Sequence, residues 1–387
     1  GLGDVYKRQL FKVENGKAAA VLEPETTIKN GDFEEFEGNV FKGFSHDDPG
    51  KATFVDTEVK YRGRASCRME AQTKGCARIR PVVKVRPWHL YCLKFMMKSK
   101  DLKGKPRVEV DGRDVDKRQL SYQVPPVKPT QDWTEHCILF NSWGNSVVRI
   151  DLGLWSWCVK GGTVWIDDLR IEPAGLYNVL RRPGCPVTVK GSDGTVYEEG
   201  KDYARIEDPH LAPWDARYHE PPAIKVREGS RIKEGEFLLV SYYSPLIRGE
   251  HSVSVCFSEP EVWEIIEYNL RRLKEIFHPK EYLASLDEVR LVNHCYACRS
   301  RGMTTGELMG ATGRRLYEIV KKVDPDADML IWQDMFDPFH NALRKNYYYN
   351  PGTCDKSWEG LPKDVVIATW KRKRESQEFF FKRGHRQ

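Results

Sequence analysis

The chain contains no apolar run that approaches the ~20 residues needed to cross a bilayer as a helix. It also lacks an excess of one charge, because its 387 residues include 62 basic and 56 acidic side chains with a formal net charge of +6. Its one dense basic run, residues 371–374, is followed at once by Glu375 and is typical of a solvated helix start. We therefore expect neither a membrane nor a nucleic acid as partner, and nothing in the sequence identifies a protein partner.

The sequence also lacks the cysteine pattern of a disulfide scaffold. Its ten cysteines follow no repeating spacing, and several lie in apolar, strand-like stretches such as Leu90–Leu93, where a free thiol behaves as a small hydrophobic group. Free thiols favour a reducing compartment or an anaerobic source. Residues 1–9 lack the apolar core of a signal peptide and resemble read-through sequence at the end of an assembled fragment. The localisation therefore stays unknown: secreted, periplasmic and cytoplasmic remain open.

The length is sufficient for two or three domains, each with its own core. We predict four segments: a truncated or artefactual N-terminal stretch (1–23), a β-sandwich (24–175), a β-rich connector (176–254) and part of a barrel (255–387). The sequence stops just after an amphipathic helix, where an α/β protein would enter its next strand. We therefore expect the chain to be a fragment of a longer protein.

Residues 30–173 show a pattern of strands and turns with almost no sustained helical period. In one short run, Ala77, Ile79 and Pro81 share one face, and the arginines between them share the other. Other stretches rich in β-branched and aromatic residues lie between clusters of Gly, Pro, Asp and Asn; they are residues 91–97, 107–110, 136–140, 146–152 and 163–171. So many short strands predict an antiparallel sandwich.

Strands and helices alternate in the last third of the chain. The connector before it is strand-like and includes a buried run at residues 237–243. Beyond Ser258, helices are predicted to start near Glu259, Gly306 and Arg374, and strands to cover residues 282–286, 329–332 and 365–370. This alternation is typical of a parallel sheet, and three such units are too few to close an eight-stranded barrel.

Two of these predicted strands end in carboxylates. The first ends in the adjacent residues Asp287 and Glu288, and the second in Asp334 and Asp337. Because barrel enzymes carry catalytic groups at the carboxyl ends of their strands, we expect these acids to meet at one rim. Paired carboxylates whose pKa values are pushed apart are what glycoside cleavage requires. The alternative is that they are N-caps of the following helices.

Of these acids, Asp287, Glu288 and Asp334 are the catalytic candidates, whereas Asp337 is predicted to contact the substrate. Four further residues are also predicted to contact it. Trp332 and Trp370 lie at strand ends, where their rings would form an aromatic floor for a sugar. His219 and Glu220 belong to a polar loop held by two prolines, which is a candidate to reach the same site.

The run GTVWIDDLRIE at residues 162–172, together with NGDFE at residues 30–34, resembles the last and first strands of carbohydrate-binding modules found beside bacterial polysaccharide hydrolases. The resemblance covers residues 30–173 and implies a jelly-roll sandwich in which the two edges meet. Such edges often hold a structural calcium ion. The resemblance implies Glu34 and Asp168 as its carboxylate ligands; the alternative is a cap or an ion pair at a strand edge.

Modules of this kind bind sugars on exposed aromatic rings. Trp133, Trp143, Trp155 and Trp157 lie in the corresponding half of the domain. Trp155 and Trp157 are two residues apart and would share one face of a strand, which makes them the predicted sugar-binding pair. Strand tryptophans are also common in cores, so the rings support the fold more than any particular ligand.

Asp287-Glu288 together with the run WQDM at residues 332–335 resembles the glycoside hydrolase barrels related to the family 20 β-N-acetylhexosaminidases. The resemblance implies Glu288 as general acid/base and Asp287 as the residue that orients a substrate acetamido group. The glycines of the family's Gly-Gly-Asp-Glu motif are replaced here by Ser285 and Leu286. If the substrate lacks an acetamido group, Asp334 is the expected second carboxylate.

A Cys-x-x-Cys sequence at Cys295 and Cys298 follows His294. It is compatible with half of a zinc site or a redox pair, with Cys354 and His340 as distant candidates, but a loop that packs near the active rim explains it as well. A zinc-dependent protein built around these cysteines is therefore a third hypothesis, which metal analysis would test.

The fold class predicted is multidomain β plus α/β: an antiparallel jelly-roll β-sandwich, a β-rich connector and a partial (β/α)8 TIM barrel. The chain is predicted to be a fragment of a glycoside hydrolase that acts on a poly- or oligosaccharide, with an attached sugar-binding module and no catalytic cofactor. The fragment alone is expected to be inactive. The alternative is a non-catalytic glycan-binding protein. Sugar, linkage and stereochemical outcome are not specified by the sequence.

Overall fold

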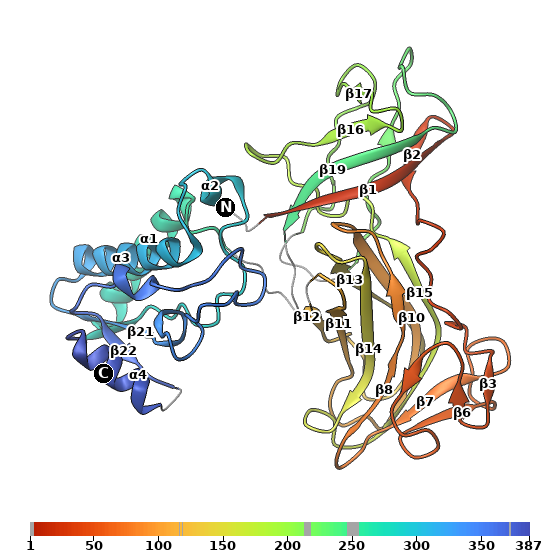
Figure 1. Cartoon of the computed structure of the whole chain (residues 1–387), viewed down its shortest axis with the longest axis horizontal. Coiled ribbons are helices and arrows are strands. Elements are labelled where there is room, and N and C mark those ends of the chain that lie inside the picture. Colours follow the sequence, from red (N-terminus) through yellow and green to blue (C-terminus); the bar gives the residue numbers. More distant parts are fainter. Residues whose placement is uncertain (1–3, 116, 118, 213–217, 246–254, 371–372) are drawn as a thin grey trace. The chain divides into compact units, whose positions relative to one another are not determined.

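The computed structural model describes residues 4–115, 117, 119–212, 218–245, 255–370 and 373–387 (Figure 1). They divide into two compact units, one running from Tyr6 to Val253 and the other containing residues 254–387. The first is built almost entirely from β-sheets, and the second contains the helices. Within the described ranges, no helix has both the length and the apolar character of a membrane span. Residues 371 and 372 of the basic run lie outside these ranges.

Two antiparallel sheets form a β-sandwich in the first unit. One has the strand order β13-β10-β15-β7-β6 and the other β12-β11-β14-β8-β5, with β9 paired to β14. The strands are β5 (Ser45–His46), β6 (Thr53–Asp56), β7 (Ser66–Glu70), β8 (Cys76–Arg80), β9 (Val82–Lys84), β10 (Leu90–Lys100), β11 (Arg107–Gly112), β12 (Gln119–Gln123), β13 (Gln131–Asn141), β14 (Val147–Trp155) and β15 (Thr163–Pro173). A small hairpin of β3 (Phe36–Glu37) and β4 (Val40–Phe41) precedes them.

The period-2 alternation of the sequence decides which residues fill the sandwich core. In β8, Ala77 and Ile79 are fully buried while Arg78 and Arg80 are half-buried, as predicted. In β14, Val148, Ile150 and Leu152 have no exposed surface. All five longer stretches predicted as strands are confirmed as β10, β11, β13, β14 and β15. The polar residues of β8, β11 and β14 therefore share the outer face of their sheet.

The first and last parts of the sandwich lie against each other, as the resemblance implied. The backbone N–H of Leu169 donates to the carbonyl of Gly31 at 2.7 Å. A Cβ atom on Gly31 would lie 2.0 Å from that leucine's carbonyl oxygen, so only glycine fits. This close approach explains the glycine in the NGDFE run.

A third sheet completes the first unit, in the order β17-β16-β19-β1-β2-β18. Four strands come from the predicted connector: β16 (Thr188–Gly191), β17 (Val196–Tyr197), β18 (Ile224–Lys225) and β19 (Phe237–Pro245). Its other two strands, β1 (Asp4–Glu14) and β2 (Lys17–Ala20), come from the segment that we expected to be truncated or artefactual. Residues 4–14 and 17–20 of that segment therefore belong to a folded sheet, whose core includes Phe11, Val13 and Val240.

One expectation about the cysteines is wrong. Cys92 was predicted to be a free thiol, but the structure joins it to Cys137 in a disulfide with a Cα–Cα distance of 5.9 Å. The two residues lie on the neighbouring antiparallel strands β10 and β13, whose pairing brings them close enough to bond. Sequence spacing alone gave no sign of this because the partners are 45 residues apart.

The second unit is a three-stranded parallel sheet with helices. Its strands β20 (Glu281–Leu283), β21 (Asp328–Trp332) and β22 (Val366–Ala368) lie side by side in chain order. The helices are α1 (Pro260–Phe277), α2 (Tyr296–Arg299), α3 (Thr305–Val323) and α4 (Arg374–Lys382), with 3-10 turns η1 (Asp334–Phe336) and η2 (Ser357–Gly360). The predicted alternation and parallel pairing are confirmed.

Side chains on the two faces of this sheet are buried to different extents. Tyr282, Met329, Ile331 and Ile367 are buried and belong to one apolar cluster with residues of α3. Residues of the opposite face are only partly buried, and Leu283 is 53% exposed. Beside β20, a groove of ≈690 Å³ is lined by apolar residues of this strand and of α1, including Leu270 and Leu273. One face and one edge of the sheet thus remain open within the described residues.

Candidate functional site

The ends of β20 and β21 bring two of the predicted acids together. The loop after β20 carries Glu288, and η1 begins with Asp334 directly after β21. The backbone N–H of Glu288 donates to Oδ2 of Asp334 at 2.8 Å. Because β20 and β21 are parallel neighbours, both residues lie at the carboxyl ends of their strands.

Asp334 is completely buried. Its Oδ2 also accepts a hydrogen bond from Nδ2 of Asn341 at 2.8 Å. Its Oδ1 has no hydrogen-bond partner among the described residues. A buried carboxylate oxygen without a partner is costly, and such atoms are concentrated at functional sites or bind a water or ligand.

Glu288 is more accessible, with 39% of its side chain exposed. The pKa of its carboxyl is raised above the ordinary value, first by partial burial and then by the negative charges of Asp334 and Asp287. This holds although the guanidinium of Arg290 contacts Oε2 of Glu288. Arg290 in turn lies over the ring of Tyr348, 5.0 Å from its centroid. A carboxyl with a raised pKa retains its proton closer to neutral pH, as a general acid requires.

The backbone before Glu288 is strained. Ser285, Leu286 and Glu288 have φ values of 56°, 63° and 45°, in the left-handed region that residues with a Cβ rarely adopt. Each such residue costs about 1–3 kcal/mol, and clusters of them are found at active sites. The conformation keeps Asp287 exposed, with one oxygen accepting from Ser285 Oγ at 2.5 Å.

The other residues predicted for this rim lie in different surroundings. Trp332 is half-buried, and its backbone N–H donates to the carbonyl of Ser285 at 3.3 Å. Trp370 is 49% exposed, and its ring centroid lies 5.1 Å from that of His340. Asp337 is fully buried, with Oδ2 bonded to Gln333 Nε2 at 2.7 Å and Oδ1 to a backbone N–H at 2.8 Å. Their role in substrate binding stays a prediction.

A second candidate surface is the outer face of β11, β12 and β14 in the sandwich. The guanidinium of Arg107 lies 4.4 Å from the ring centroid of Trp157 and 4.9 Å from that of Tyr122. Trp157 is 60% exposed, whereas Trp155 is 6% exposed and covered by Arg78. The prediction that both tryptophans share a strand face is wrong, because β14 ends at Trp155 and a turn follows.

Charged residues cover the rest of this face. Asp151, which is 1% exposed, contacts Arg80 Nε at 3.2 Å and Arg149 Nε at 2.7 Å. Arg78 lies 3.6 Å from the same carboxylate and 2.8 Å from Asp47. The result is a polar surface of paired charges with an exposed aromatic residue, Trp157, at its end.

The proposed calcium ligands both contact arginines. Glu34 accepts hydrogen bonds from the backbone N–H of Arg64, and Asp168 accepts from Arg170 Nη1 at 2.8 Å and from Arg62. The neighbouring Asp167 is fully buried, and Oδ2 accepts from the backbone N–H groups of residues 61 and 62. Calcium binding by Glu34 and Asp168 stays an untested prediction.

His219 and Glu220 belong to the first unit. His219 Nε2 lies 2.9 Å from Oδ2 of the buried Asp208, and its ring stacks on Tyr177 with a centroid distance of 4.3 Å. Glu220 is exposed. These contacts hold His219 against the rest of the first unit. The prediction that its loop reaches the substrate stays untested.

Sequence reasoning missed three residues of these sites. Arg290, two positions after Glu288, was visible as a neighbouring cation, and Arg107 as a charge at the start of a strand. Asn341 gave no signal, because only the turn after η1 brings it to Asp334.

Comparisons with known proteins concern the fold. No protein-family model matches the sequence, and no curated protein matches it. Similar solved structures include a CBM4 module, with 16% identity, a TM-score of 0.27 and coverage of 38% of this chain and 99% of the module. The CBM22-1 xylan-binding domain of Paenibacillus barcinonensis Xyn10C has 16% identity and a TM-score of 0.28, and the match covers 38% of this chain and 92% of the domain. TmCBM61 in complex with β-1,4-galactotriose has 13% identity and a TM-score of 0.28, and the match covers 38% of this chain and 98% of the module. At these identities and TM-scores, the likenesses carry no argument about function.

Proposed function

We propose that the second unit belongs to a glycoside hydrolase barrel in which Glu288 is the general acid/base. The observation that carries this proposal is the pairing of Glu288 with the buried, incompletely hydrogen-bonded Asp334 at the carboxyl ends of adjacent parallel strands. Glu288 would donate a proton to the glycosidic oxygen and later remove one from water. Its raised pKa suits the first of these steps.

Asp334 has no exposed surface, so we assign it a positioning role. Its carboxylate fixes the backbone of Glu288 and, through its charge, favours the protonated form of that side chain. The exposed Asp287 is then the second carboxylate that reaches a substrate. An acetamido group oriented by Asp287 would act as an internal nucleophile, in line with the resemblance to family 20 β-N-acetylhexosaminidases.

The backbone conformation supports that resemblance. Ser285 and Leu286 occupy the positions where the family carries glycines, and both have left-handed φ values. Here a conformation that glycine adopts freely is retained by residues for which it is costly. The open face and edge of the β20-β21-β22 sheet support the barrel, because further strands and helices would cover Leu283 and the groove beside α1.

The test is hydrolysis of a panel of aryl glycosides, with and without a 2-acetamido group, by this chain and by the product of the native gene that contains it. We expect Glu288→Gln to lower kcat by about 10²–10⁴-fold. Glu281→Gln, at the exposed start of the preceding strand β20, is the matched control and should retain activity. Asp287→Asn should affect acetamido substrates most. Unchanged hydrolysis by Glu288→Gln would contradict the assignment.

A second proposed function, glycan binding by the sandwich, is favoured by the exposed Trp157 beside Arg107. A ring with one free face is the surface on which a pyranose stacks, and the guanidinium holds that ring in place. This function does not need catalysis, so it is also the alternative if no hydrolysis is found. The half-exposed Tyr122 would extend the platform.

Retention on affinity gels containing xylan, β-1,4-galactan or cellulose tests this second proposal. Trp157→Ala should weaken binding by about tenfold or more, because exposed tryptophans dominate such contacts. Tyr61→Ala removes an aromatic residue of similar exposure (47%) elsewhere in the sandwich and is the control. An equal loss of glycan binding in both variants would argue against a sugar-binding role of Trp157. Failure of every gel to retain the parent chain would do so as well.

Calcium binding by Glu34 and Asp168 remains a proposal for the sandwich. The ion would have to replace the arginine contacts of both carboxylates. Thermal unfolding with calcium or with a chelator tests it: a rise in Tm that is absent in Asp168→Asn supports the site, and identical curves dismiss it.

A further inference from the structure

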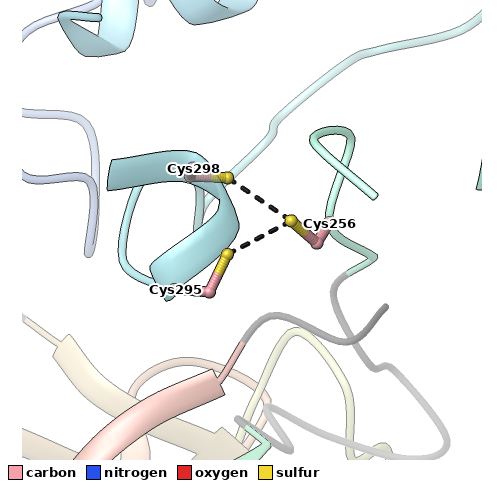
Figure 2. A group of neighbouring side chains, drawn as sticks. All are labelled: Cys256, Cys295 and Cys298. Atoms are coloured by element: carbon pink, nitrogen blue, oxygen red, sulfur yellow. Dashed lines mark hydrogen bonds between the residues drawn. The ribbon is translucent and has the colours of Figure 1, made fainter. Parts of the chain in front are cut away.

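Three buried cysteines of the second unit converge on one point (Figure 2). Sγ of Cys256 lies 3.1 Å from Sγ of Cys295 and 3.4 Å from Sγ of Cys298. All three sulfurs lie within 4.8 Å of one another, and the residues are only 2–3% exposed. The sequence had indicated the pair in the Cys-x-x-Cys run, but not Cys256, which comes 39 residues before it.

The backbone around the three sulfurs is arranged as a thiolate site. Cys295 is the N-cap of α2 and Cys298 lies within that helix, so the spacing places both side chains toward Cys256 before α1. The sulfurs of Cys256, Cys295 and Cys298 each accept a backbone hydrogen bond, from Ser258, Cys298 and Asn293 respectively. Such N–H···S contacts stabilise negative charge on sulfur.

The three sulfurs lie close enough together to share one ion. An odd number of thiols cannot all be consumed by disulfides within the group, so at least one cysteine would remain buried without a covalent partner. A zinc ion with Zn–S bonds of about 2.3 Å holds its sulfurs about 3.8 Å apart, which is close to the separations found here.

We propose that Cys256, Cys295 and Cys298 bind one Zn²⁺ ion as a structural site. Zinc suits three thiolates because it is borderline-soft and tetrahedral. The fourth position would be taken by a solvent molecule or by the hydroxyl of Ser258, whose Oγ donates to Cys298 Sγ at 3.3 Å. Arg301 Nη1 lies 3.4 Å from the same hydroxyl, and its charge opposes the single excess negative charge of a three-thiolate zinc centre.

The site has a definite structural task. It connects the entry to α1 with the loop between β20 and α3, and that loop also carries Asp287 and Glu288. Hydrogen bonds already anchor the first half of this loop, for example from the N–H of Val292 to Oδ1 of Asn350 at 2.9 Å. The helix α2, which carries two of the three sulfurs, has only four residues. The ion would therefore fix both ends of the segment that carries the candidate acid/base. The site does not depend on the proposed function.

The test is metal analysis of the whole chain purified under reducing conditions without chelators. We expect about one zinc per chain. Replacement by Co²⁺ should give thiolate-to-metal charge-transfer bands and the strong visible bands of a tetrahedral site. Cys256→Ser and Cys298→Ser should each lose the metal. Cys354→Ser is the matched control, because Cys354 is equally buried in the same unit but lies outside the three-sulfur group.

The measurement on the parent chain does not require that the variants fold. Substoichiometric zinc after reconstitution with excess Zn²⁺, or bound iron in place of zinc, would overturn the proposal. A Cys256–Cys295 disulfide found by mass spectrometry in chain kept under reducing conditions would overturn it as well. If the metal is present, its removal by a chelator should lower the Tm of the second unit and increase amide exchange in residues 287–301.

Discussion

Each unit of the chain presents a cluster of carboxylates, and the two clusters differ in what surrounds them. On the sandwich face, both oxygens of Asp151 contact arginines. At the strand ends of the second unit, Asp334 makes no ion pair among the described residues, and one of its oxygens has no partner. Both aspartates are buried to the same degree. The first cluster is therefore a neutralised surface, whereas the second keeps a negative charge that acts on the pKa of Glu288.

The largest expected effect is that of Asp151→Asn. The change leaves Arg80 and Arg149 beside a neutral amide, and breaking a buried ion pair on one side costs on the order of 3 kcal/mol. Urea unfolding with hydrogen exchange by mass spectrometry would assign the loss to the sandwich. A loss below about 1 kcal/mol would mean that the arginines are satisfied by water, and the contrast between the clusters would weaken.

Asp334→Asn should have a smaller effect, within about 1 kcal/mol. The amide oxygen can still accept from the N–H of Glu288 and from Asn341, and no cation loses its partner. The same unfolding experiment measures this in the second unit. A loss as large as that of Asp151→Asn would show that Asp334 has an unseen cationic partner, which would make the two clusters alike.

The smallest effect concerns the pH dependence of Glu288→Gln. Because the pKa of Glu288 is raised in the folded state, the parent chain loses stability as pH rises through that pKa. The variant lacks this loss, so its Tm relative to the parent should increase between about pH 4 and pH 7. Glu281→Gln is the control. A relative Tm that falls over this range would mean that the Arg290 contact dominates.

Much of the fold follows from the sequence because it depends on local pattern. The alternation in β8, the helix starts near Glu259 and Gly306, and the acids that follow β20 and β21 are all encoded within a few residues. The sequence did not show that β20 ends at Leu283, earlier than the predicted end at Leu286, so that its acids lie in the loop beyond it. The meeting of Glu288 and Asp334 was likewise predictable, since parallel strands align their carboxyl ends. Whether three strands belong to a barrel is not encoded locally and stays a proposal.

What escaped prediction depends on contacts between distant residues. The disulfide partner of Cys92 and the third cysteine of the sulfur group are set by strand pairing and packing. The opposite burial of Trp155 and Trp157 results from a turn that ends β14. The left-handed backbone at Ser285 and Leu286 was hidden because these residue types normally avoid it.

The place of β1 in its sheet has a consequence for biosynthesis. This strand lies between β2 and β19, and the hydroxyl of Tyr6 lies 2.9 Å from that of Ser241, a partner 235 residues away. The ribosome therefore releases the first strand long before the last one, while the whole sandwich is made in between. The sandwich can fold during synthesis. The sheet that contains β1 cannot be completed until β19 has been synthesised, and pairing the two strands then carries the entropic cost of closing a long loop. Until then β1 exposes an unpaired edge, which makes this stage the most prone to aggregation.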